Sequence, residues 1–251
     1  MAFDSLRDFL GSLERMGELK HIKAEVEPVH ELGAIAYHSL LKKGPALLFE
    51  NVKGHKTPIV TNVLSTDKKM AVALGMEGDM RAMFEKFLSG FKNPIVPVEV
   101  KSGPCKEEIY QDDAVDITKF PTPVWHEKDA GPYLGTFHGC ITKDRATGDQ
   151  NMGMYRLLVK DRKTLWMSIH RDGLAHYRQY EAANEPMPMA VAIGMEPLLC
   201  IGAMSPISSG LARHAEFAYV GGLHGKPVEL TKCQTLDVLV PAQAEIVLEG
   251  E

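Results

Sequence analysis

The sequence has few cysteines, no long apolar run and no excess of basic residues. Its four cysteines stand 33 to 60 residues apart without a Cys-x-x-Cys pair, so we expect neither a disulfide framework nor a zinc ribbon. No stretch approaches the roughly 18 apolar residues of a membrane span. Asp4 and Asp8 stand where the apolar part of a signal peptide would begin. These absences predict a protein of a reducing, cytoplasmic compartment.

Acidic residues outnumber basic ones, 33 to 28, which gives a formal net charge of −5. Nucleic-acid binding needs clustered Lys and Arg to neutralise phosphates, so we expect no nucleic-acid partner. The 251 residues, 45% of them hydrophobic, are enough for one large or two ordinary domains with their own cores. The composition therefore indicates a soluble, slightly acidic globular protein.

The first hundred residues have the spacing of an α/β domain. Ser5 precedes an apolar stripe with helical spacing that stops at Gly17, which predicts an N-capped helix. Further helices are expected at 31–41, 70–75 and 80–90, and short buried strands at 45–50 and 58–63. We therefore predict an N-terminal α/β domain over residues 1–100.

The pattern changes after Asn93, where prolines become frequent and long helical spacing disappears. Residues 101–251 are expected to form a second domain, a mostly antiparallel sheet or barrel interrupted by one helix near 174–184. Its strands are predicted at 135–142, 154–160, 165–170, 189–193 and 198–203. The chain finishes on an apolar strand at 245–251, which suggests a truncated protein or one subunit of a split assembly.

Three separate segments carry side chains suited to binding a metal ion. Asn151 offers an amide oxygen to a hard cation, and His170 stands at an expected strand end before a Gly turn. Glu216 lies in an apolar run, where an unpaired carboxylate is costly to bury. Together they would form a mixed oxygen and nitrogen site suited to Mn²⁺ or Mg²⁺. The structural alternatives are a surface turn for Asn151, a core histidine for His170 and a paired carboxylate for Glu216.

Arg156 and two glutamates near the C-terminus suit the binding and protonation of a carboxylic acid. Arg156 offers a planar fork to a carboxylate, or alternatively forms a salt bridge. Glu245 and Glu249 are four residues apart and would point to the same face of a strand. Two neighbouring carboxylates raise the pKa of one of them, which keeps a protonated acid available near neutral pH. The alternative is the exposed polar face of an edge strand.

These motifs, taken in order along the chain, resemble the UbiD family of decarboxylases, which use prenylated flavin mononucleotide (FMN). No single motif is diagnostic, but their order and spacing are specific. The segments that carry the resemblance are Leu6-Arg7-Asp8-Phe9-Leu10, Phe120-Pro-Thr-Pro-Val-Trp-His126, Asp129-Ala-Gly-Pro-Tyr133, Asn151-x-Gly-x-Tyr-Arg156, Ala192-Ile-Gly-x-x-Pro197 and Val240-Pro-Ala-x-Ala-Glu-Ile-Val-Leu-Glu-Gly250.

The resemblance implies an N-terminal α/β domain followed by a flavin-binding split β-barrel like that of flavin reductases. It implies that Asn151, His170 and Glu216 bind a divalent cation, Mn²⁺ or Mg²⁺, at the cofactor phosphate, often with a potassium ion (K⁺) nearby. The residues expected along the cofactor are Asn151, Met152, Met154, Tyr155, Arg156, Ile169, His170 and Glu216.

The resemblance also implies catalytic roles. Arg156, Glu245 and Glu249 would form the family's Glu-Arg-Glu constellation, in which the Arg steers the substrate carboxylate and one Glu donates the proton that replaces CO₂. The implied reaction is the reversible, non-oxidative decarboxylation of an aromatic or acrylic (α,β-unsaturated) acid. Losing CO₂ from an sp² carbon leaves an anion without a resonance sink, and the modified flavin accepts those electrons.

Partners and alternatives follow from the same resemblance. A flavin prenyltransferase would supply the cofactor. Family members continue well past Gly250, so we hypothesise that this chain alone is inactive and works in a homo-oligomer or a split-subunit complex. The alternatives are a non-catalytic flavin-binding subunit or fragment, and a plain metal hydrolase that uses Asn151, His170 and Glu216.

Overall fold

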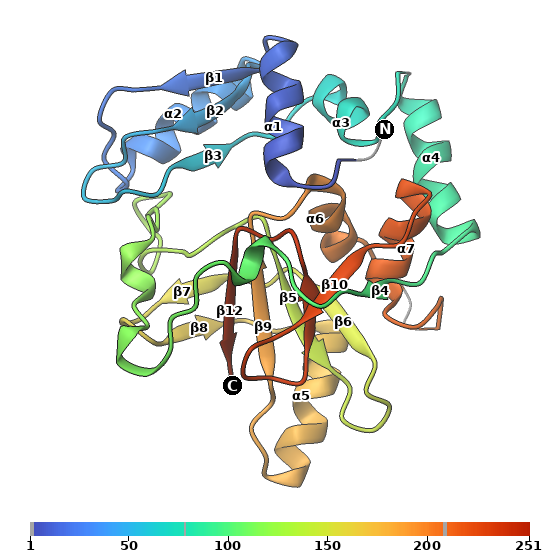
Figure 1. The fold of residues 1–251 in the computed structure, drawn as a ribbon. Helices are drawn as coiled ribbons and strands as arrows, with labels where there is room; N and C mark the ends of the chain where they lie inside the picture. Colours follow the sequence, from blue (N-terminus) through green and yellow to red (C-terminus); the bar gives the residue numbers. More distant parts are fainter. Residues whose placement is uncertain (1–2, 78, 208–209) are drawn as a thin grey trace.

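The computed structural model describes residues 3–77, 79–207 and 210–251, in which small β-sheets are surrounded by helices (Figure 1). The helices are α1 (Leu6–Arg15), α2 (Glu31–Leu41), α3 (Asp67–Ala73), α4 (Met80–Lys92), α5 (Arg171–Ala183), α6 (Pro197–Met204) and α7 (Ala215–His224). The strands are β1 (Leu19–Ile22), β2 (Ala46–Phe49), β3 (Ile59–Thr61), β4 (Val98–Glu99), β5 (His138–Lys143), β6 (Gln150–Gly153), β7 (Leu157–Val159), β8 (Leu165–Met167), β9 (Met189–Ile193), β10 (Glu229–Lys232), β11 (Leu239–Pro241) and β12 (Ile246–Gly250).

The N-terminal elements form a small α/β layer. The Ser5 hydroxyl accepts the Asp8 N–H at 3.2 Å, which satisfies one of the free N–H groups at the start of α1. Strand β1 pairs in parallel with β2, and β2 pairs in antiparallel with β3. Helix α2 packs Leu32 against Phe49 in the core of this layer. The capped first helix and the helix at 31–41 predicted from the sequence are confirmed.

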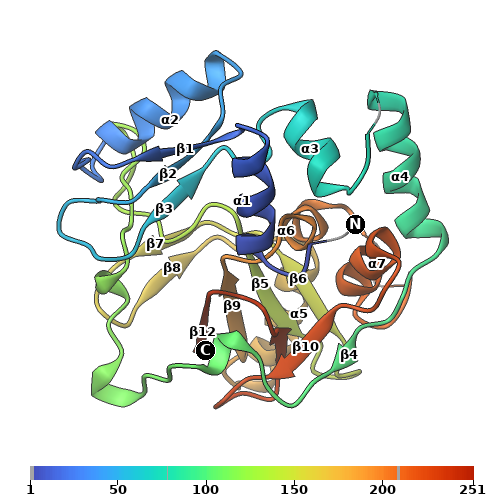
Figure 2. The ribbon, with the colours of Figure 1, turned by 45° about the horizontal axis from the view of Figure 1, so that its top comes forward.

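A four-stranded antiparallel sheet of order β12-β9-β5-β6 forms the centre of the molecule. Successive side chains point to opposite faces, so Ile141 packs in a large cluster with α6 and α7, whereas Cys140 packs in a second cluster. Figure 2 shows α6 and α7 beside α1 and α4, next to these strands. Among the described strands β6 pairs with β5 alone, so its other edge has no strand partner in that part of the chain.

The segment after α4 packs onto the second half of the chain. Strand β4 pairs in parallel with β10, which pairs with β11. The Ile95 N–H donates to the Ala218 carbonyl at 2.9 Å, and the rings of Phe91 and Tyr219 lie 4.5 Å apart. Residues 80–100 therefore contribute to the packing of α7. The domain boundary at residue 100 remains a prediction.

The second half contains more helix than the sequence predicted. Residues 198–203, predicted as a strand, lie in α6, and α7 is a further helix besides the predicted one. Helix α6 starts at Pro197, and the Glu196 carboxylate accepts the N–H groups of Leu198 and Leu199 at 2.8 and 2.9 Å. Both helices are buried on nearly every side, so their sequences lack the polar face that reveals helical periodicity.

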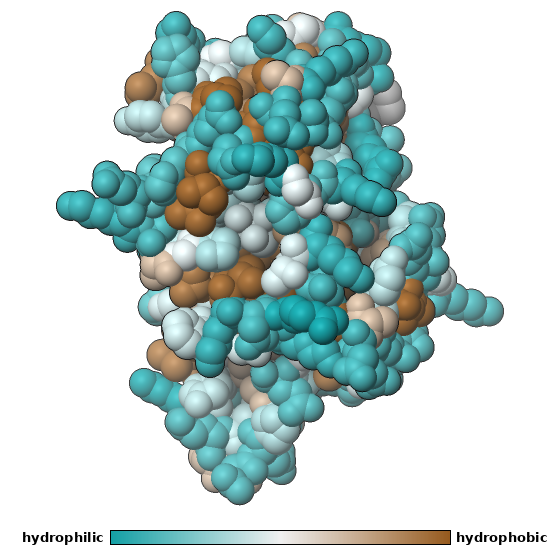
Figure 3. All heavy atoms as spheres, turned by 90° about the vertical axis from the view of Figure 1, so that its left-hand side faces the viewer, coloured by the Kyte–Doolittle hydropathy of each residue, from teal (hydrophilic) through white to brown (hydrophobic). Residues whose placement is uncertain are grey.

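The expected split β-barrel is not confirmed. The described strands form four separate small sheets of two to four strands, and none of these sheets closes on itself. The established fold is therefore a mixed α/β architecture. None of the described helices has the length and apolar character needed to cross a membrane. On the face drawn in Figure 3, apolar side chains form separate patches among hydrophilic ones.

Candidate active site

A cavity of about 780 Å³ opens beside the free edge of β6. Its walls come from five parts of the chain, which are residues 151–156, the start of α5, the end of α6 with the residues after it, Glu216 of α7, and residues between Trp125 and His138. The predicted residues Asn151, Arg156, His170 and Glu216, which are up to 65 positions apart in the sequence, line this one cavity. A cavity of this volume is in the range of small-molecule and cofactor sites.

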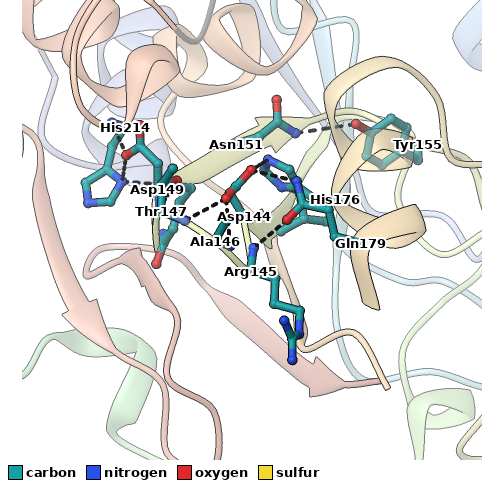
Figure 4. Close-up of polar contacts among 12 residues, drawn as sticks. Asp144, Arg145, Ala146, Thr147, Asp149, Asn151, Tyr155, His176, Gln179 and His214 are labelled. Atoms are coloured by element: carbon teal, nitrogen blue, oxygen red, sulfur yellow. Dashed lines mark hydrogen bonds and ion pairs between the residues drawn. The ribbon is translucent and has the colours of Figure 1, made fainter. Parts of the chain in front are cut away.

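Asn151 is positioned by a short chain of hydrogen bonds. It lies on β6, and its amide donates to the Tyr155 hydroxyl at 3.4 Å (Figure 4). The Tyr155 hydroxyl donates in turn to the carbonyl of His170 at 3.1 Å, so β6 is linked to the start of α5. This use of the amide nitrogen leaves the Asn151 carbonyl oxygen available to a cation.

Glu216 is a buried carboxylate in the first turn of α7, with only 4% of its surface exposed. One of its oxygens accepts the Met152 N–H at 3.2 Å. No Lys, Arg or His forms an ion pair with it within the described part of the chain. Loss of solvation raises the pKa of Glu216 to about 7, assisted by the negative charges of Asp172 and Asp149. A buried carboxylate without a cationic partner is well suited to bind a metal ion.

His170 stands immediately before α5 and is exposed to the cavity. Its Nε2 lies 3.0 Å from the Ser168 hydroxyl. Within the described residues, no group of three or more His, Cys, Asp or Glu side chains is arranged to hold a metal ion. The candidate donors are instead an amide, an imidazole and one buried carboxylate, a mixed oxygen and nitrogen set that suits a hard divalent cation.

Arg156 follows β6, lines the cavity and is exposed. No carboxylate pairs with it among the described residues, so its guanidinium is available to an anionic ligand. Met152, Met154 and Tyr155 also line the cavity, as expected for cofactor contacts. Ile169 does not reach the wall and packs instead beside the apolar cluster that contains Tyr155.

The structure does not bring Glu245 and Glu249 to the cavity. Glu245 accepts two hydrogen bonds from the Arg7 guanidinium, both at 2.7 Å. Glu249 accepts the backbone N–H groups of Gln234 and Thr235 at 2.7 and 2.6 Å. The reason is topological, because β12 and β6 are opposite edges of the four-stranded sheet. The two glutamates therefore lie at the opposite edge of the sheet from Asn151, whereas the family pattern led us to expect them beside Arg156.

Sequence reasoning missed a buried titratable residue of the cavity wall, His138. Its Nε2 lies 2.8 Å from the Tyr155 carbonyl, and burial lowers its pKa to about 4. The ring is therefore neutral and its Nε2–H donates to that carbonyl. His138 lies within the predicted strand 135–142, where the apolar neighbours gave no signal that separates it from a core histidine. Asp172, which follows the predicted His170 by two positions, was missed as well.

Comparisons with known proteins agree with the resemblance in the sequence. Residues 10–87 match the 3-octaprenyl-4-hydroxybenzoate carboxy-lyase N-terminal domain, and residues 96–251 match the 3-octaprenyl-4-hydroxybenzoate carboxy-lyase Rift-related domain of UbiD. An uncharacterized protein of Archaeoglobus fulgidus is 36% identical over 272 residues, which cover 100% of this chain and 55% of that protein.

Solved structures of UbiD-class enzymes have the same fold over the whole chain. HmfF of Pelotomaculum thermopropionicum, in complex with FMN, is 34% identical with a TM-score of 0.89, covering 98% of this chain and 54% of that one. Vanillic acid decarboxylase of Sedimentibacter hydroxybenzoicus in its closed form is 31% identical with a TM-score of 0.93, covering 100% and 55%. The chain thus spans about half the length of the relatives it matches.

Proposed function

Because the chain belongs to the UbiD family, we propose that it forms the cofactor-binding part of a prenylated-FMN-dependent decarboxylase that acts on an aromatic or α,β-unsaturated carboxylic acid. The observation that carries this proposal is the convergence of Asn151, Arg156, His170 and Glu216 on one cavity. A relative of the same fold was solved with FMN and another form of it with prenylated FMN, which supports a flavin as the ligand of this cavity.

Asn151, His170 and Glu216 are the residues that would hold a divalent cation, Mn²⁺ or Mg²⁺, against the flavin phosphate. The carboxylate of Glu216 supplies the negative charge, and the Asn151 carbonyl oxygen and a His170 nitrogen supply neutral donors. When bound, the prenylated flavin supplies the electron sink that decarboxylation at an sp² carbon requires. A nearby potassium ion belongs to the proposal, but no residue in the described chain identifies a site for it.

Arg156 is proposed to bind the substrate carboxylate. Its guanidinium is permanently charged and matches a carboxylate with two parallel N–H donors. The side chains of Met152 and Met154 on the same segment provide an apolar wall that excludes water from the reacting carbon. Holding the carboxylate in one orientation is the contribution that this chain makes to the rate.

A second function is favoured by the positions of the two glutamates. Glu245 and Glu249 form hydrogen bonds with Arg7 and with the backbone at 234–235, at the opposite edge of the sheet from β6. Neither is therefore placed to protonate a substrate beside Arg156. The alternative is therefore a non-catalytic flavin-binding subunit or fragment, whose partner supplies the catalytic acid. If either glutamate acts as the acid, as the family pattern led us to expect, β12 must rearrange to bring it there.

Association with another chain or segment is part of both proposals. Helix α4 exposes three large apolar side chains four residues apart, and the exposed fractions are 63% for Met80, 61% for Phe84 and 37% for Leu88. Residues at this spacing lie on one face of a helix, and a continuous exposed apolar patch is typical of a contact surface. A relative of this fold has been solved in a dimeric form. We propose a homo-oligomer or split-subunit complex that acts in the cytoplasm and receives its cofactor from a flavin prenyltransferase.

Substitution of Arg156 tests the substrate role. The chain is produced together with a flavin prenyltransferase, and wild type, Arg156→Ala and the control Arg178→Ala are assayed against a set of aryl and acrylic acids. Arg178 is exposed on α5 and does not line the cavity. We expect Arg156→Ala to retain flavin but to lose about a hundredfold or more in kcat/KM, with Arg178→Ala unchanged.

The outcomes separate the candidates. Full activity of Arg156→Ala would contradict the proposed role of the guanidinium. Bound flavin without turnover by the wild-type chain would support the non-catalytic subunit. Hydrolysis that requires Mn²⁺ but no flavin would replace both with the metal hydrolase.

A further inference from the structure

The free edge of β6 is covered by side chains from the start of α7. Residues Gln150 and Met152 point their N–H groups away from β5. The Gln150 N–H donates to His214 Nδ1 at 3.1 Å, and the Met152 N–H donates to a Glu216 oxygen at 3.2 Å. Gln150 and Met152 of the strand are thus paired with His214 and Glu216 at the beginning of the helix. This pairing satisfies both buried N–H groups of the strand edge.

His214 adopts a backbone conformation that needs support. Its φ of 54° and ψ of 59° lie in the left-handed region, which costs a residue with a side chain about 1–2 kcal/mol. The Asp149 carboxylate accepts the His214 backbone N–H at 2.9 Å, and the Gln150 N–H donates to Nδ1 of the neutral ring. Figure 4 shows the His214 ring directed toward Asp149 and away from the cavity side chain of Asn151. Strained residues persist where several contacts fix them, as they do here.

The strand end that meets His214 is itself fixed. The Gln150 side-chain amide donates to the Leu239 carbonyl at 2.9 Å and accepts the Leu239 N–H at 2.7 Å. These two hydrogen bonds to β11 hold the register of β6 just before Asn151. The start of α7 is therefore attached to a strand whose register is fixed, and the attachment points are the bonds of His214 to Asp149 and Gln150.

We infer that His214 is a positioning residue for the proposed cation site: held by Asp149 through its backbone N–H and by the Gln150 N–H at Nδ1, it fixes the start of α7 against the edge of β6 and so sets the placement of Glu216 relative to Asn151. The inference rests on the proposed function, because that function makes Glu216 and Asn151 cation ligands. The contacts that support the inference involve neither flavin nor metal. His214 does not line the cavity, so it acts through Glu216. Residues that orient metal ligands in this way typically contribute about tenfold to a hundredfold to metal affinity.

Two substitutions of similar size separate positioning from general packing. In His214→Asn the amide oxygen occupies the place of Nδ1, so it accepts the Gln150 N–H, and Asn tolerates the left-handed region. In His214→Gln the amide lies where Nε2 was, and the Gln150 N–H loses its acceptor. His214→Ala removes the groups at both the Nδ1 and the Nε2 positions. Each variant is compared with wild type for Mn²⁺ affinity in the presence of FMN, by electron paramagnetic resonance, and for hydrogen exchange of the Met152 amide.

We expect His214→Gln and His214→Ala to bind Mn²⁺ about tenfold or more weakly and to exchange the Met152 amide faster, and His214→Asn to restore both. Wild-type Mn²⁺ affinity and Met152 protection in all three variants would overturn the inference, as would equal losses in His214→Asn and His214→Gln. If the wild type itself fails to bind Mn²⁺ with FMN, the proposed function is contradicted. The Met152 exchange rates then decide the positioning role alone: selective rescue by Asn supports it, and unchanged rates overturn it.

Discussion

At the scale of single residues, His138 links the cavity wall to the stability of the protein. Its ring is neutral when folded, because burial lowers its pKa from 6.5 to about 4. Between these two values the unfolded chain binds a proton that the folded chain does not bind. Lowering the pH across this interval therefore favours unfolding.

The pH dependence of unfolding isolates this effect when wild type is compared with His138→Gln. The Gln amide reaches the place of Nε2 and retains a donor to the Tyr155 carbonyl, but it does not titrate. From about pH 7 to about pH 5, wild type should lose about 2 kcal/mol more of its free energy of unfolding than the variant does. Urea unfolding at the two pH values measures the difference, and equal losses would show that His138 is not held neutral.

At the scale of the elements, replacing a glycine by alanine is expected to have opposite effects on stability in helices α7 and α1. A Cβ on Gly221 of α7 would overlap the carbonyl oxygen of Ile95, whereas a Cβ on Gly11 of α1 would meet only Arg15, at 3.6 Å. Gly221→Ala should destabilise the protein by about 1–3 kcal/mol through overpacking. Gly11→Ala should stabilise it by about 0.5–1 kcal/mol through helix propensity.

Chemical denaturation of both variants tests this account of α7. The two changes add the same methyl group to a helix, so propensity alone predicts stabilisation in both. If Gly221→Ala were as stable as wild type, α7 would not be held closely against the residues after α4. Its position, and with it that of Glu216, would then be set by other contacts.

The elements also show where sequence reasoning succeeds and fails. The helix at 31–41 and the strand at 189–193 were predicted with their observed bounds, because local spacing and turn residues define them. Helix α6 was predicted as a strand because it is apolar on all sides, and its N-cap Glu196 with Pro197 at the first position is the only local sign of a helix start. Burial by α7 and the central sheet decides its state, and no local pattern contains that information.

At the scale of the whole molecule, the sequence predicted which residues share a site better than it predicted the architecture. Asn151, Arg156, His170 and Glu216 were identified as candidates from residue chemistry and family resemblance, and the fold brings them to one cavity. The glutamates of the last strand were misplaced because an i, i+4 spacing fixes a face but not which edge of a sheet the strand occupies. The order of strands depends on long-range packing, which is also why the expected barrel could not be tested from the sequence.

Glu216 and its neighbours are proposed to bind a divalent cation that holds flavin in this cavity. The most direct test is native mass spectrometry of the chain produced with a flavin prenyltransferase, supplied with Mn²⁺, and compared with Glu216→Gln. We predict that wild type carries one flavin and one Mn²⁺, and that Glu216→Gln loses the metal and most of the flavin. Equal occupancy in both proteins, or a wild type that carries neither flavin nor metal, would contradict the claim.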